Sequence, residues 1–68
     1  MILNIEIERE DDGRWIAEVA ELPGVMAYGV SPEEAKTRVQ ALALRVVADR
    51  IENEESGHDF NSISFIAA

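Results

Sequence analysis

The residues that could perform chemistry in this chain are carboxylates, one histidine and a few hydroxyls. His58 is the only histidine, and it stands in a short acidic stretch with Glu54, Glu55 and Asp59. These four side chains could form a metal cluster, but their spacing matches no ligand pattern, and an acidic loop that contains glycine is usually solvated. We therefore expect neither a metal nor a cofactor.

A second candidate for chemistry is the carboxylate pair Asp11 and Asp12, which could serve acid–base catalysis. Hairpin turns use aspartate for backbone reasons, and that structural interpretation is favoured here. Ser31 has no histidine partner and precedes Pro-Glu-Glu, which is typical of a helix N-cap. The glycines do not follow the pattern of a phosphate-binding loop. The sequence thus predicts a protein that is not an enzyme.

The charge of the chain limits its partners. Its 68 residues hold 14 acidic and 6 basic side chains, for a formal net charge of −8. Such a chain repels the phosphates of nucleic acid and has no basic stripe that would release counterions, so we expect no direct binding to nucleic acid. The charge either serves solubility or attracts a basic partner to an acidic surface.

The chain length predicts one domain over residues 1–68, with a small core. Its N-terminus lacks a basic segment followed by a long apolar run, so we expect no signal peptide and no membrane association. The chain contains no cysteine, which is compatible with a reducing compartment. We expect a cytoplasmic protein.

Alternating apolar and polar residues predict four strands, over residues 2–10, 14–20, 25–30 and 61–67. Asp12-Gly13 lies between the first two and predicts a hairpin. The segment Leu22-Pro23-Gly24-Val25 predicts a type II turn before the third. Gly29, near the end of that strand, indicates a bulge or a close approach of another backbone.

Ser31-Pro32-Glu33-Glu34 predicts the start of a helix that runs from about residue 32 to 52. We expect a stripe of Ala35, Val39, Leu42 and Val46, continued by Ala43, to face the core. The second half of the helix is apolar over more than one stripe. Its extra residues either lie deep in the core or form a contact surface for a second copy or another partner. The candidate residues for an oligomer interface are Leu44, Val47 and Ile51.

The element order β-β-β-α-β indicates the α+β class. A right-handed crossover through the helix would place the last strand parallel to the first. We therefore predict a four-stranded sheet of order 3-2-1-4, with one helix on one face.

A series of motifs along residues 1–52 resembles the HicB-like antitoxin family. In order, the motifs are Asp12-Gly13, Trp15, Ala17, Leu22-Pro23-Gly24, Gly29, Ser31 and Glu33-Glu34-Ala35. The resemblance implies a partial ribonuclease H-like fold without ribonuclease activity. It also implies a HicA-type toxin as partner, which is a small basic ribonuclease that cuts messenger RNA and is neutralised when its active surface is covered. Fuller members carry a C-terminal DNA-binding module that this sequence lacks, so we expect no operator binding by this chain alone.

Residues 1–30 contain seven acids against two bases. The resemblance implies a purpose for this acidic part of the chain, which is to attract and mask a basic toxin. The candidate contact residues are Asp11, Asp12, Trp15, Glu18 and Glu21. The alternative is an orphan structural or adaptor domain that associates with itself and has no toxin partner.

Overall fold

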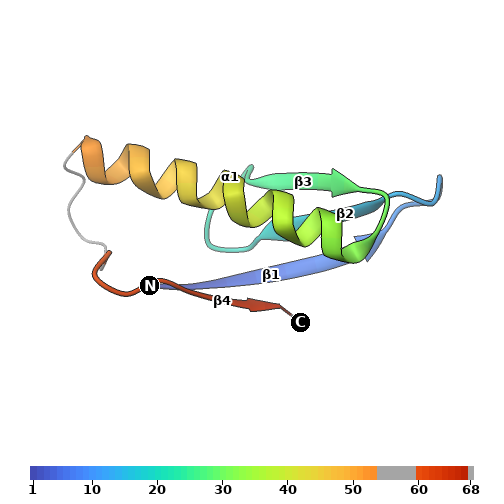
Figure 1. The fold of residues 1–68 in the computed structure, drawn as a ribbon, viewed down its shortest axis with the longest axis horizontal. Coiled ribbons are helices and arrows are strands. Elements are labelled where there is room, and N and C mark those ends of the chain that lie inside the picture. Colours follow the sequence, from blue (N-terminus) through green and yellow to red (C-terminus); the bar gives the residue numbers. More distant parts are fainter. Residues whose placement is uncertain (54–59, 68) are drawn as a thin grey trace.

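The computed structural model describes residues 1–53 and 60–67, which form one sheet with one helix on it (Figure 1). The elements are β1 (Ile2–Arg9), β2 (Trp15–Val19), β3 (Met26–Gly29), α1 (Pro32–Glu52) and β4 (Ser64–Ala67). The strand order is β3-β2-β1-β4, with β4 parallel to β1 and the other pairs antiparallel. The predicted α+β class, element order and sheet order are confirmed.

The hairpin between β1 and β2 closes through a short loop with a glycine at its end. The amide of Glu10 donates to the carbonyl of Arg14 (2.7 Å), and the amide of Gly13 donates to the carbonyl of Glu10 (3.0 Å). Gly13 has a φ of +91°. This arrangement matches a three-residue hairpin loop, in which a turn is followed by a left-handed residue. It sets a register in which Glu6 lies opposite Glu18.

The Pro-Gly segment also forms the turn that the sequence predicts. The amide of Val25 donates to the carbonyl of Leu22 at 3.0 Å, and Gly24 has a φ of +85°. A type II turn needs such a positive φ at its third position. Both Leu22 and Val25 are buried, so the turn also closes one end of the core.

The start of α1 lies against the end of β3, where Gly29 is required. A Cβ atom on Gly29 would stand 2.5 Å from the amide nitrogen of Ala35. The helix is capped by Ser31, whose hydroxyl accepts from the amide of Glu34 at 3.1 Å. The carboxylate of Glu34 accepts from the amide of Val30 at 3.1 Å, one residue before the usual partner in a capping box.

The helix presents a row of residues four apart to the sheet: Ala35, Val39, Ala43 and Val47 are buried. Leu42 and Val46, which the sequence placed in the stripe, are only partly buried and flank this row. The placement of Val47 in an oligomer interface needs correction, because this side chain is 2% exposed and belongs to the core. The cause is the position of α1, which packs mainly on β3 and β2 and less on β1.

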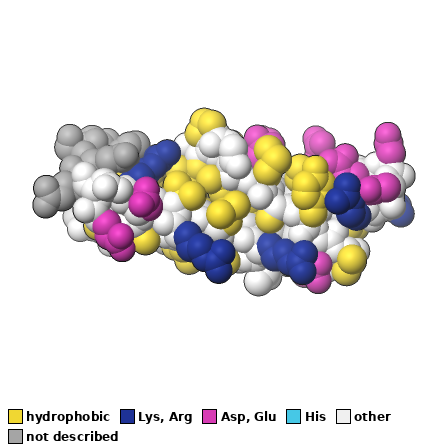
Figure 2. All heavy atoms as spheres, turned by 90° about the horizontal axis from the view of Figure 1, so that it is seen from above, with side chains coloured by type: hydrophobic (Ala, Val, Ile, Leu, Met, Phe, Trp, Pro, Cys, Tyr) yellow, Lys and Arg dark blue, Asp and Glu magenta, His cyan; other side chains and the backbone are white. Residues whose placement is uncertain are grey.

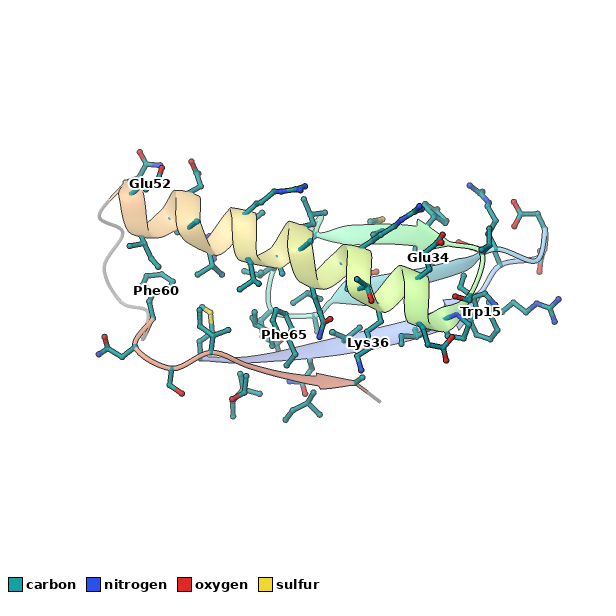
Figure 3. All side chains as sticks on the ribbon, in the orientation of Figure 1. Trp15, Glu34, Lys36, Glu52, Phe60 and Phe65 are labelled. Atoms are coloured by element: carbon teal, nitrogen blue, oxygen red, sulfur yellow. The ribbon has the colours of Figure 1, made fainter. Side chains whose placement is uncertain are left out.

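The sheet contributes the rest of the core. Leu3, Ile5, Ala17 and Val19 are fully buried beneath α1. β4 is shorter than the predicted strand 61–67 and begins at Ser64, where the amide of Ser64 donates to the carbonyl of Met1 (3.0 Å). Phe65 points from β4 toward the helix (Figure 3).

Candidate functional site

One face of the sheet carries no helix, and we call it the open face. Because side chains alternate along a strand, it presents the residues between the buried ones, and the pairing of the strands places Glu6 beside Glu18 and Ile16 beside Tyr28. The described residues of the open face are Ile2, Asn4, Glu6, Glu8, Arg14, Ile16, Glu18, Ala20, Met26, Tyr28, Ser64 and Ile66.

Glutamates of two neighbouring strands occupy paired positions in the middle of the open face. Glu6 on β1 lies directly opposite Glu18 on β2, and Glu8 follows two residues along β1. The amide of Ala20 donates to the carbonyl of Asn4 (3.1 Å), and by alternation Glu6 and Glu18 are also a hydrogen-bonded pair, with Cα atoms about 5.5 Å apart. Like charges in this position destabilise a sheet.

In the described part of the chain, no cation relieves this repulsion. Within residues 1–53 and 60–67, neither Glu6 nor Glu18 forms an ion pair, since Arg14 binds Asp12 (2.7 Å) and Arg38 binds Glu34 (3.2 Å). Glu6 is exposed and Glu18 is half-buried. The two charges therefore face solvent beside each other and are available to a cationic partner.

An apolar strip borders these carboxylates on the β3 side. Ile16 is half-buried next to Tyr28, and Met26 stands beside Glu18. Met26 and Tyr28 remain 41% and 39% exposed. The guanidinium of Arg14 stacks 4.5 Å from the centre of the Tyr28 ring, so the strip ends at the ion pair of Arg14 with Asp12.

Glu21 extends the acidic surface beyond the end of β2. Its carboxylate accepts from the side-chain amide of Asn4 (2.6 Å) and from the backbone amide of Asn4 (2.7 Å). These two hydrogen bonds, the side-chain one first, hold the pKa of Glu21 below its ordinary value. The carboxylate is therefore kept charged and fixed against the first residues of β1.

Asp12 lies at the tip of the hairpin, where it organises the loop. Its carboxylate accepts from the backbone amide of Arg14 (3.0 Å) and from Nε of Arg14 (2.7 Å). The backbone hydrogen bond is the main cause of the lowered pKa of Asp12. This geometry is that of an aspartate that stabilises a turn, and Asp11 beside it is exposed.

The five predicted contact residues do not share one surface. Glu18 lies on the open face and Glu21 at its border, whereas Asp11 and Asp12 lie at the tip of the hairpin. Trp15 lies on the opposite, helix-covered face, half-buried against the core near the start of α1 (Figure 3).

Sequence reasoning missed Glu6 and Glu8. The signal was present, because a hairpin centred on Asp12 pairs residues whose numbers are equally distant from it, and this places Glu6 opposite Glu18. The alternation of β1 then assigns Glu8 to the same face.

Of the predicted oligomer residues, Leu44 and Ile51 are on the surface, 46% and 48% exposed, while Val47 is in the core.

Seen from the side of α1 and β3, hydrophobic side chains gather along the middle of the molecule, with Lys and Arg side chains along one border (Figure 2). Asp and Glu side chains lie toward both ends of the same view.

The described residues contain no group of three or more side chains arranged to hold a metal ion, and they enclose no pocket. The stretch with Glu54, Glu55, His58 and Asp59 lies outside the described residues. No helix in the described ranges has the length and apolar character that a bilayer crossing requires.

No family model, curated protein or solved structure matches this chain.

Proposed function

We propose that this chain is a HicB-like antitoxin module that neutralises a HicA-type toxin by masking the toxin's basic active surface. The sequence motifs that resemble the family support this proposal. A toxin that cuts messenger RNA must bind phosphates through a basic surface, and a protein that competes for that surface needs carboxylates on a rigid support.

The single observation that carries the proposal is the pair of carboxylates on the open face. Glu6 and Glu18 lie opposite each other on the two central strands, and neither forms an ion pair in the described part of the chain. A basic partner would remove the repulsion between them when it binds, so part of the binding free energy comes from relief of strain in the free protein.

The open face also has the composition of a protein-binding surface. Ile16, Met26 and Tyr28 form its apolar strip next to the carboxylates. Binding surfaces join apolar contact area, which supplies affinity, to charges that steer the encounter and set the orientation. Glu21, fixed by Asn4, would hold the far border of the contact.

The test is a calorimetric titration of this chain with a HicA-type toxin, together with inhibition of RNA cleavage by the same toxin. The double variant E6Q/E18Q removes two charges from the open face, and we expect it to bind at least about tenfold more weakly at low salt. The control E33Q/E52Q removes the same number of charges from the two ends of α1, and we expect it to bind like the unaltered chain.

High salt should weaken binding by the unaltered chain and reduce the difference between the two double variants, because salt screens exposed charges. Equal affinity of E6Q/E18Q and E33Q/E52Q would show that net charge, and not the open face, drives the contact. Absence of any binding and of any inhibition would reject the antitoxin function.

A further inference from the structure

The charges of this sheet have an unusual distribution. The central strands carry all of the charged strand residues, which are Glu6, Glu8, Arg9 and Glu18, whereas the edge strands read MAYG and SFIA and carry none. Native proteins usually place charged side chains or proline on edge strands to prevent pairing with another chain. Here that protection is missing from β3, which forms one edge of the sheet along its whole length. On the other side of the sheet, β4 pairs only with Ile2–Ile5, and the part of β1 beyond it carries charged residues.

The free edge of β3 offers regular backbone groups. The amide of Val19 donates to the carbonyl of Val25 (3.0 Å), so by alternation Ala27 and Gly29 also bond to β2. Met26 and Tyr28 therefore turn their amide and carbonyl groups away from β2, toward the free edge. The carbonyl of Tyr28 accepts from Nη1 of Arg38 at 3.1 Å, and a carbonyl has a second lone pair for another donor.

This edge is complementary to itself. A two-fold axis beside Ala27 would place the two β3 strands antiparallel, with Met26 of each copy opposite Tyr28 of the other. Each of these two pairs would exchange two backbone hydrogen bonds, which gives four in all. On the open face, the exposed Met26 would then contact the Tyr28 ring of the other copy, a favourable sulfur–aromatic pair. On the helix side, the two Ala27 side chains are small enough to meet at the axis.

The helices fit the same arrangement. Because α1 lies mainly over β3 and β2, strands spaced about 4.8 Å apart would bring the two helices to roughly 10 Å from each other, near the usual packing distance. Arg38 reaches the edge of β3, and Leu42 and Val46 follow it at four-residue intervals on the same flank. Their partly buried side chains would become covered.

Charge decides between a second copy and the basic partner proposed above. Arg14 and Arg38 border the free edge of β3, and the strand itself has no acid. Both arginines are paired with acids, Arg14 with Asp12 and Arg38 with Glu34, so this edge has little net charge. It therefore does not attract a basic protein, and two copies can approach here without bringing the carboxylates of their open faces together. The open faces remain accessible in the resulting pair.

We propose that two copies of this chain associate through their β3 edges to form one continuous eight-stranded sheet with a two-fold axis at Ala27. The proposal concerns the free protein and is tested without the toxin, although Met26 and Tyr28 also belong to the apolar strip of the open face. It also differs from the helix interface of Leu44, Val47 and Ile51 that the sequence predicts.

The test measures the mass of the full chain by light scattering and sedimentation over a range of concentrations. The variant M26K/Y28K would place lysines directly opposite each other across the two-fold axis, and we expect it to weaken the dimer by about tenfold or more. The control L44K/I51K introduces the same charges at helix positions of similar exposure, and we expect it to remain dimeric. I66K tests the edge of β4 in the same way.

Amide hydrogen exchange of the unaltered chain gives a second readout that needs no variant. The amides of Met26 and Tyr28 should become more protected as concentration rises, because these groups bond only in the dimer. A monomer at every concentration, protection that does not change with concentration, or a dimer that survives M26K/Y28K but dissociates in L44K/I51K or I66K would overturn the proposal. Circular dichroism confirms that each variant is folded.

Discussion

Replacement of Glu18 by glutamine should make the protein more stable. Glu18 lies directly opposite Glu6 on the open face, and neither side chain has a cationic partner in the described part of the chain. Glutamine keeps the size and the hydrogen-bonding capacity of the side chain but removes its charge. The variant therefore isolates the repulsion between the two carboxylates.

The expected gain follows from the geometry. Two unit charges about 6 Å apart in a medium close to water repel each other by about 0.7 kcal/mol, and like charges opposite each other on neighbouring strands cost about 0.2–1 kcal/mol. We take about 0.5 kcal/mol for Glu18→Gln. In a domain of this size, that gain corresponds to a rise of about 2–4 °C in Tm.

The assay is thermal unfolding followed by circular dichroism, at one protein concentration, in low salt and in high salt. The gain should shrink in high salt, because the Debye length falls to about 3 Å at 1 M. Glu33→Gln is the control of opposite sign, since it removes an acid from the first turn of α1 and should cost about 0.3–1 kcal/mol. A loss of stability in Glu18→Gln, or a gain that salt does not change, would refute the assignment of repulsion to this pair.

Three further predictions concern the elements that support the open face. Gly29→Ala should destabilise the fold by about 1–3 kcal/mol in urea unfolding, because its Cβ would stand 2.5 Å from the amide nitrogen of Ala35; unchanged stability would mean that α1 can move away. Ser31→Ala should cost about 1 kcal/mol by the same measurement, and Ser31→Asp should recover it, since both native and replacement oxygens accept at the N-cap. Because the pKa of Glu21 is lowered in the folded state, the charged form of this residue stabilises the fold. That stabilisation is complete at a pH above the ordinary pKa of 4.5, and it is lost as the pH falls through the lower pKa of the folded state. Glu21→Gln should therefore show a smaller loss of stability on acidification, and an identical pH profile would show that the contact with Asn4 contributes nothing.

Much of the fold follows from local sequence signals. The Asp-Gly and Pro-Gly turns, the serine cap and the helix from Pro32 to Glu52 are all confirmed, because a positive φ, a proline at the first helical position and an N-cap each restrict the residue types that can be present. The first and last residues of each strand were less predictable. β4 begins at Ser64, three residues later than expected, because its extent depends on pairing with β1.

The orientation of the helix and the composition of the open face depend on tertiary structure. The apolar second half of α1 allows several stripes, and only its docking on β3 and β2 selects the row that includes Val47. In the same way, charge alone did not separate Asp12, which holds its own turn, from Glu6, which faces Glu18. The register of the hairpin was needed to make that distinction.

The most direct test of the account is a nuclear magnetic resonance titration of the labelled chain with a HicA-type toxin. If the open face is the binding surface, the largest shifts will occur at Glu6, Ile16 and Glu18, while the exposed positions Leu44 and Ile51 on α1 will change little. Shifts concentrated on α1, with the signals of Glu6 and Glu18 unmoved, would contradict it.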